Sequence, residues 1–388
     1  MEPLSREAEL LLTSLRPAFD EAAAARVRAL IQSGLDWNFL NQLATRHRLS
    51  PLVYRRVDAA AATDVPRAVF IEMWRQYEQN ARRNRTMLEE MRDAVDRLST
   101  AGIRVVAYKG PLLALQLYDD VTLREFEDLD LLIDVNQVSA AKDLLLRNGY
   151  VAHDDLTPAA EDALRNSAVH YHLGFVQPDS GTKLELHWKS DPEFQVERTN
   201  DPSWWASLDR IGLDGQEVLS FSASELLMVL CLHGAKHQGH RLGWIAEIAA
   251  LIRKSAIDWP WMMRFAHERQ CMRRVLAALK LSEQLLNAEL PKEITDQISN
   301  DGEVERLCDD IASRMFSHSD DERQGLDRLR ISLRLYDRLP QRARHAWQVA
   351  FSPTMYEYSA RTLPRGLEFL YVPIRMIRLF GKYGLKRS

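Results

Sequence analysis

Cysteine is scarce in this 388-residue sequence, and its three occurrences form no pattern. Cys231, Cys271 and Cys308 are odd in number, far apart and without the short spacings of metal ligands. This excludes a disulfide framework of the kind that staples small secreted domains, and it predicts a reducing compartment. Cys231 lies in an apolar helical run, so we expect its thiol to be buried.

Long apolar runs and an excess of positive charge are also lacking. No uninterrupted apolar stretch approaches the length of a transmembrane helix. Residues 1–7 lack the basic and apolar parts of a secretory signal, and we therefore expect a cytoplasmic protein. The net charge of -4 argues against generic nucleic-acid binding through bulk electrostatics, although it allows a local basic patch.

The most informative stretch runs from residue 103 to residue 135. A β-branched run, residues 103–108, stops at Lys109-Gly110, and Pro111 follows at the position favoured for the first residue of a helix. Glycine allows a close approach of the backbone, and the N–H groups that open a helix form an anion site. Lys109 adds a mobile positive charge, so this turn predicts a phosphate site.

A second strand of the same stretch begins with two carboxylates. Read with a period of two, Asp128 and Asp130 point to one face, and the apolar residues between and after them fill the other. Paired oxygen ligands suit Mg²⁺ held together with substrate phosphates. The alternative is an exposed strand end with two solvated aspartates. Arg124 precedes the pair and either orients Asp128, touches a phosphate, or forms a surface ion pair with Glu125 or Glu127.

Residues 168–176 and 182–188 predict a β-hairpin around a string of turn residues, 177–181. In its second strand Leu184, Leu186 and Trp188 face one way, whereas Lys183, Glu185 and His187 face the other. From residue 191 to residue 215 we expect a loop-rich connector.

These motifs together resemble the uncharacterised nucleotidyltransferase family of the polymerase-β-like superfamily. The resemblance is carried by Lys109-Gly110, Arg124, Asp128-x-Asp130 and its apolar run, and Leu184-Glu185-Leu186-His187-Trp188. The superfamily pattern is a glycine turn, a helix, Asp-x-Asp and a third carboxylate on a later strand. It therefore implies that Glu185 completes a metal site with Asp128 and Asp130. This chain has Lys-Gly where the superfamily usually has Gly-Ser or Gly-Gly.

The resemblance implies an α+β fold, in which a small mixed-sheet core is flanked by N- and C-terminal helical regions. We expect residues 1–98 to form a helical region, 99–200 the nucleotidyltransferase core, and 201–388 a helical domain with a basic tail. The implied activity moves an NMP from an NTP, with Mg²⁺ or Mn²⁺, to a hydroxyl-bearing acceptor. That acceptor could be a sugar, another metabolite, a peptide, a protein or RNA. The alternatives are an inactive binding or scaffold protein of the same fold and a toxin-like enzyme that modifies RNA.

The helical C-terminal part offers further polar groups. His233, His237 and His240 are spaced to share one helical face beside Lys236, although Gly239 could end the helix before His240. Zinc usually needs another ligand, so we expect Lys236 and His237 to line the cleft near the triphosphate or acceptor instead. Glu247 lies in an apolar segment and should have a partner, for which Arg241 or a histidine is a candidate.

The tail, residues 361–388, differs from the rest of the chain. It interleaves apolar residues with seven basic ones, and Pro373 predicts a kinked or split helix. A basic amphipathic segment can contact an anionic membrane peripherally, or it can pack its apolar face on the body of the protein. The basic residues are Arg361, Arg365, Arg375, Arg378, Lys382, Lys386 and Arg387.

Overall fold

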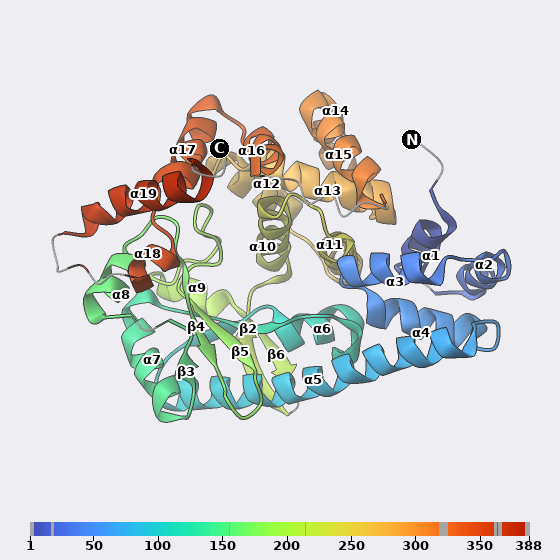
Figure 1. Cartoon of the computed structure of the whole chain (residues 1–388), viewed down its shortest axis with the longest axis horizontal. Helices are drawn as coiled ribbons and strands as arrows, with labels where there is room; N and C mark the ends of the chain where they lie inside the picture. The colour runs from blue at the N-terminus through green and yellow to red at the C-terminus, as the bar shows by residue number, and fades with distance from the viewer. Residues whose placement is uncertain are drawn as a thin grey trace.

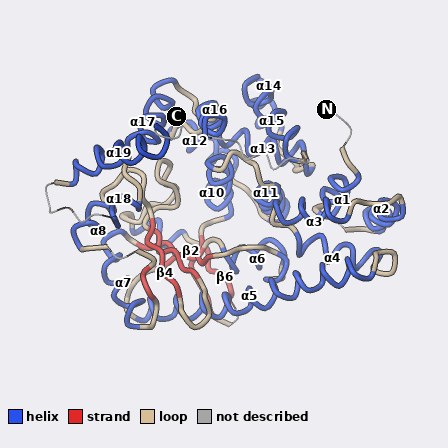
Figure 2. Tube along the Cα trace, viewed as in Figure 1, coloured by secondary structure: helices blue, strands red, loops and turns tan. Residues whose placement is uncertain are grey.

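The computed structural model shows an α+β protein in which helices surround a single mixed sheet (Figures 1 and 2). It describes residues 4–16, 19–154, 156–213, 215–317, 325–360, 363 and 367–384. The fold class predicted from the sequence is confirmed. No helix in these ranges is both long enough and apolar enough to cross a membrane.

The sheet has the strand order β3-β4-β5-β2-β1-β7-β6. Its two central pairings differ in direction, because β2 runs antiparallel to β1 and parallel to β5. On the other side β1 pairs in parallel with β7, and antiparallel pairs complete both edges. The strands are β1 (Val105–Ala107), β2 (Asp128–Ile133), β3 (Val151–Ala152), β4 (His172–Val176), β5 (Lys183–His187), β6 (Asp209–Leu213) and β7 (Gln216–Ser220).

One face of the sheet is buried beneath helices α5 and α7, as Figure 1 shows along its lower edge. Leu129, Leu131 and Ile133 of β2 pack there, which confirms the strand period predicted for this segment. Asp128 and Asp130 lie on the opposite face, which is directed toward the helical layer above. The elements between the strands are α6 (Gly110–Tyr118), α7 (Val138–Arg147), α8 (Pro158–Arg165) and α9 (Pro202–Ser207).

Helices before and after the sheet share a second hydrophobic core. Residues of α1–α4 and of α10–α15 belong to one buried cluster, which also includes Leu132 and Tyr108 at the sheet. The N-terminal helices are α1 (Arg6–Ser14), α2 (Glu21–Gln32), α3 (Trp37–Arg46), α4 (Ser50–Ala61) and α5 (Arg67–Thr100). The C-terminal helices are α10 (Ala223–Lys236), α11 (Leu242–Lys254), α12 (Trp259–Glu268), α13 (Met272–Leu286), α14 (Lys292–Asn300), α15 (Gly302–Met315), α16 (Gly325–Arg334), α17 (Leu339–Phe351), α18 (Met355–Ala360) and α19 (Tyr371–Gly384).

Two expectations need correction. The connector predicted from residue 191 to 215 contains α9 and β6, and β7 follows directly, so the sheet continues past residue 200. Pro373 does not split the tail helix, because it is the third residue of α19. Its missing N–H belongs to the first turn, where backbone donors have no partner within the helix. Of the basic residues predicted in the tail, Arg361, Arg365, Lys386 and Arg387 lie outside the described residues.

Candidate active site

The strand register brings the acidic residues of β2 and β5 side by side. Asp130 is directly opposite Glu185 in the parallel β2–β5 pair, and Glu185 is opposite Gly174 of β4. Two residues further along each strand, Leu132, His187 and His172 form the next cross-strand row on the same face. Because directly opposed residues share a face, Asp130, Glu185 and both histidines lie on the same side as Asp128.

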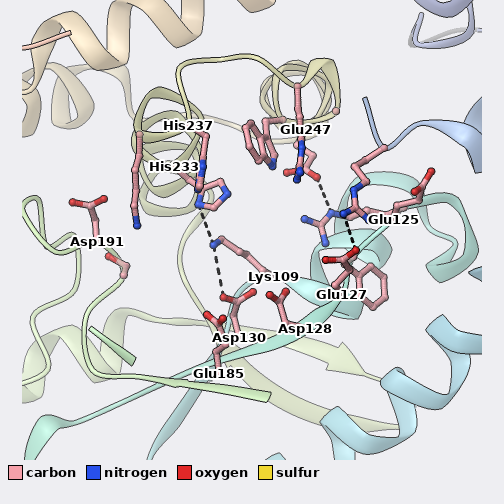
Figure 3. Close-up of a pocket in the computed structure, with 18 of the residues that line it drawn as sticks. Lys109, Glu125, Glu127, Asp128, Asp130, Glu185, Asp191, His233, His237 and Glu247 are labelled. Carbon is pink, nitrogen blue, oxygen red and sulfur yellow. Dashed lines mark hydrogen bonds and ion pairs between the residues drawn. The ribbon is translucent and has the colours of Figure 1, made fainter. Parts of the chain in front are cut away.

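These side chains face a cavity of about 370 Å³ between the sheet and the helical layer. Figure 3 shows the three carboxylates on the sheet side, Lys109 above them, and His233 and His237 on the helical side. Seven of the eight predicted site residues line the cavity; the exception is Gly110. The seven are Lys109, Arg124, Asp128, Asp130, Glu185, Lys236 and His237.

The two aspartates of β2 have opposite electrostatic environments. Burial raises the pKa of Asp128 to about 6, and repulsion from Asp130 and Glu185 adds to the effect. Burial alone would raise the pKa of Asp130 as well, but Lys109 and His187 outweigh it and lower that pKa below its usual range. Lys109 Nζ lies 3.7 Å from Asp130 Oδ1, and His187 Nε2 lies 3.0 Å from the same oxygen. The pair therefore holds one carboxylate firmly ionised and one that gains a proton easily.

Two histidines extend the acidic cluster along β4 and β5. Glu185 is 3.1 Å from His187 Nε2 and 3.7 Å from His172 Nε2. Ligand atoms of these three residues lie within 4.8 Å of one another, close enough to hold a metal ion. Burial and the neighbouring His187 lower the pKa of His172 to about 4, so its ring is neutral near pH 7. His187 Nε2 approaches both carboxylates, whereas His187 Nδ1 has no hydrogen-bond partner among the described residues.

The sequence patterns around these histidines assign them no function. The available signal was weak: His187 lies two positions after Glu185 on the same strand face. His172 reaches the cluster only through the β4–β5 pairing, which a single sequence does not specify.

The Lys109-Gly110 turn places a helix end against the carboxylates. Gly110 has a φ of +56°, and a Cβ at this position would lie 3.1 Å from the backbone oxygen of Asp128. Glycine is therefore required both by the left-handed backbone and by the close approach. Pro111 follows in the first turn of α6, as predicted. Lys109 extends from the N-cap, and its Nζ also lies 3.4 Å from His233 Nδ1.

Arg124 does not make the contacts expected for it within its own segment. Its Nε donates to Glu247 Oε1 at 2.8 Å, and its Nη1 donates to the Gly110 carbonyl at 3.3 Å. The pair joins the sheet layer to α11, and both side chains are about nine-tenths buried (11% and 8% exposed). Burial lowers the pKa of Arg124, but Glu247 outweighs this effect and the net shift is upward. The partners suggested for Glu247, Arg241 or a histidine, were therefore wrong.

His233, His237 and His240 do not lie on one continuous helical face. The helix ends at Lys236, and Gln238 and Gly239 follow with φ values of +61° and +60°. The rings of His233, His237 and His240 instead lie 4.8–5.3 Å from the indole of Trp244, between ring centroids.

Lys236 points to the neighbouring sheet. Its Nζ donates to the Tyr171 hydroxyl at 2.7 Å, and burial lowers its pKa. Burial and the charge of Lys236 lower the pKa of His237 to about 3, so the cavity faces a neutral imidazole there.

Comparisons with known proteins bear on the family of the chain. No curated protein sequence matches the chain. A crystal structure of an antigenic nucleotidyltransferase-like protein from Paracoccidioides brasiliensis is similar at 18% identity over 54% of this chain and 93% of that one. Its TM-score of 0.33 is too low to support an argument. The sequence profile described as "Uncharacterised nucleotidyltransferase" matches residues 33–287, which include every carboxylate of the site. Because this match spans well over half of the sequence, the chain belongs to the uncharacterised nucleotidyltransferase family.

Proposed function

We propose that the protein transfers a nucleotidyl group from an NTP to a hydroxyl-bearing acceptor, with Mg²⁺ or Mn²⁺ bound by Asp128, Asp130 and Glu185. The observation that carries the proposal is the convergence of these three carboxylates. Asp130 and Glu185 are direct neighbours across two parallel strands, Asp128 lies on the same face, and all three line one cavity.

The residues present fit a divalent cation. Three buried or half-buried carboxylates repel one another, and the raised pKa of Asp128 reflects burial together with that repulsion. A cation removes the repulsion, and oxygen ligands suit Mg²⁺. His187 Nε2, which lies 3.0 Å from Asp130 and 3.1 Å from Glu185, adds a nitrogen ligand that Mn²⁺ accepts readily.

Basic residues around the cavity can bind the phosphate groups of an NTP. A bound divalent ion would neutralise phosphate charge and favour loss of the acceptor's hydroxyl proton. Lys109 stands directly above the carboxylates, where its ammonium group can pair with the distal phosphates of an NTP. Arg124 is committed to Glu247, so we assign it mainly to holding α6 and α11 together, with phosphate contact through its remaining N–H groups. Lys236 and His237 line the helical side of the cavity.

The test is to replace each aspartate and measure nucleotide binding. Asp128→Asn and Asp130→Asn should abolish Mg²⁺-dependent NTP binding in titration calorimetry, because losing a metal ligand costs several kcal/mol. Asp209→Asn, which changes an exposed acid on the outer strand β6, is the matched control and should bind as the parent does. All four NTPs are compared with and without Mg²⁺, followed by a pyrophosphate-release screen over acceptor classes.

Two results would count against the proposal. Unchanged NTP binding in both aspartate variants would place the nucleotide site elsewhere. Tight NTP binding without pyrophosphate release for any acceptor class would favour a non-catalytic binding protein of the same fold.

A further inference from the structure

A second cavity, of about 400 Å³, adjoins the candidate active site. The two cavities share Asp191 and Lys236 in their walls, so a molecule in the second can reach toward the carboxylates past these two residues. Its remaining wall comes mainly from segments that the proposed nucleotide site does not use: residues 168–170, the loop after β5, and the C-terminal elements α16, α17 and α19. Figure 1 shows α17 and α19 side by side above this end of the sheet.

A directed chain of hydrogen bonds crosses this cavity wall. The Tyr336 hydroxyl donates to Glu193 Oε2 at 2.6 Å, since a carboxylate can only accept. The hydroxyl oxygen then accepts from His345 Nδ1 at 2.7 Å, which leaves Nε2 free to accept from the Ser332 hydroxyl at 2.9 Å. The order fixes the tautomer of His345 and orients Ser332. Such a preset array of polar groups is typical of a ligand site.

Two buried arginines lie in the same wall. Arg274 is 4% exposed and donates from Nη2 to Glu193 at 3.2 Å, and Arg375 is 8% exposed and donates to the Val349 carbonyl at 2.8 Å. Arg375 Nη1 also lies 3.8 Å from Glu357 Oε2. A guanidinium group in a cavity wall attracts an anionic ligand, and its planar fork suits carboxylate and phosphate groups.

The charged groups around the cavity favour an anion. Among the wall residues, Lys236, Arg274 and Arg375 contribute positive charge against Asp191 and Glu193. Behind the wall, Glu357 pairs with Arg375 and with Arg378. The other wall residues include apolar side chains such as Val169, Pro192 and Val349, which suit the carbon frame of a small molecule. The volume lies within the range of small-molecule sites and is far too small for a folded partner.

We propose that this second cavity binds the acceptor, and that the acceptor is a small polyhydroxylated organic anion, of the size of a sugar acid or sugar phosphate. The inference rests on the proposed nucleotidyl transfer. The anionic group binds at Arg274 and Arg375, and a hydroxyl reaches past Lys236 to the carboxylates. That hydroxyl oxygen bonds to the α-phosphorus of the NTP while the bond to the bridging oxygen breaks. Pyrophosphate leaves with the electron pair, and the hydroxyl proton passes to water.

The experiment measures binding of defined probes to the full chain by titration calorimetry. D-Glucose 6-phosphate and D-glucuronate are compared with uncharged D-glucose, and we expect at least one anion to bind at least tenfold more tightly than glucose. Val349→Trp fills the cavity and should weaken anion binding at least tenfold, with Mg²⁺-NTP binding unchanged. Ala343→Trp, at an exposed position of the same helix outside the cavity wall, should leave both unchanged.

A milder variant covers the case in which the large side chain prevents folding. Ser332→Ala removes one hydroxyl from the hydrogen-bonded chain and should weaken anion binding severalfold without changing Mg²⁺-NTP binding. Failure of both anions to bind, or equal losses in Val349→Trp and Ala343→Trp, would overturn the acceptor assignment. Pyrophosphate release with RNA or peptide acceptors and not with the sugar anions would also overturn it.

The two proposals fail in different ways. If the nucleotidyl-transfer proposal is wrong, Asp128→Asn leaves NTP binding intact while the sugar anions still titrate into the second cavity. If the acceptor proposal is wrong, the aspartate variants lose NTP binding while Val349→Trp has no specific effect.

Discussion

Lys109 is a residue whose role can be tested by the kind of nucleotide that it affects. Its ammonium group lies close to Asp130 and His233, where we expect the distal phosphates of an NTP to bind. Lys109→Met should weaken triphosphate binding more than tenfold and monophosphate binding less than threefold, because the charge serves the distal phosphates. Calorimetry with ATP and AMP measures this. Lys183→Met, an exposed lysine on β5, is the control, and equal losses for both nucleotides would reduce Lys109 to a support of the turn.

His47 gives the stability of the protein a specific dependence on pH. Its ring is fully buried, Nδ1 accepts from the Leu242 backbone N–H at 3.1 Å, and Nε2 lies 3.0 Å from the Met315 carbonyl. Burial lowers the pKa of His47 to about 4, whereas an unfolded histidine titrates near 6.5. The neutral, buried His47 therefore makes its full contribution to the free energy of unfolding above about pH 6.5, and this contribution is lost as the pH falls toward 4.

Lowering the pH from 7 to 5 should therefore reduce the free energy of unfolding by about 2 kcal/mol through this residue alone. His47→Gln should remove that part of the pH dependence while keeping a polar side chain. Urea unfolding of parent and variant at both pH values measures the difference, which separates His47 from other histidines with lowered pKa. Identical pH slopes in the two proteins would contradict the assignment.

At this scale the sequence predicted what strand period and helix-start chemistry determine. Asp128 and Asp130 share a face, and Lys109-Gly110-Pro111 opens α6 as expected. The partner of Arg124 was missed because Glu247 is far along the chain and meets it only when α11 packs on the sheet layer. The local sequence pattern around Arg124 contains no information about a contact with so distant a residue.

Among the elements, the tail helix α19 combines a buried anchor with exposed apolar groups. Tyr371 is 1% exposed, stacks near Tyr358 at 4.5 Å between ring centroids, and accepts from the Leu363 N–H. Ile377, in contrast, is 74% exposed, and Phe369 just before the helix is 66% exposed. The tail therefore packs on the body through one side and presents apolar groups on another.

Single substitutions separate these two roles better than deleting the tail. Tyr371→Ala should destabilise the protein by about 3 kcal/mol, because it leaves a large buried cavity. Ile377→Ser should leave the thermal midpoint unchanged and reduce sedimentation with anionic vesicles if the tail contacts a membrane. Thermal melts and vesicle sedimentation of both variants measure the outcome. Equal melting temperatures for the parent and Tyr371→Ala would refute the packing role.

Two strands of the sheet were not foreseen. β6 and β7 are five residues each, and both begin with two adjacent polar or charged residues, Asp209-Arg210 and Gln216-Glu217, that resemble loop sequence. Of the ten residues in these two strands, only Leu213, Val218 and Ser220 are buried. So few apolar positions do not distinguish a strand from a loop in the sequence.

The hairpin of β4 and β5 was predicted because a turn-rich segment separates two clear alternations.

Across the whole molecule, the Arg124–Glu247 pair joins the sheet layer to the helical layer. Glu247→Gln leaves a buried guanidinium without its counter-charge and should cost about 3–5 kcal/mol in the free energy of unfolding. The double variant Arg124→Met/Glu247→Gln should lose much less than the sum of the losses of Arg124→Met and Glu247→Gln alone. Urea unfolding measures all four proteins of the cycle, with Glu268→Gln on the exposed face of α12 as the control. Simple additivity would show that the pair does not couple the layers.

The helical regions illustrate what remains beyond a single sequence at this scale. Helical regions were predicted before and after the core, but the shared core of α1–α4 with α10–α15 was not. An apolar stripe shows that a helix packs on something without showing on what. The second cavity was missed for the same reason, because its walls come from segments that lie far apart in the chain.

The pairing of β1 with β7 has a consequence for how the chain is made. Val106 and Leu219 are partners in the sheet, yet the ribosome completes the core motifs, from Lys109 through Glu185, before β7 emerges. Until then one side of β1 presents unpaired backbone groups, which invite pairing with other chains. We expect slow maturation and dependence on chaperones during synthesis, since such distant contacts form late.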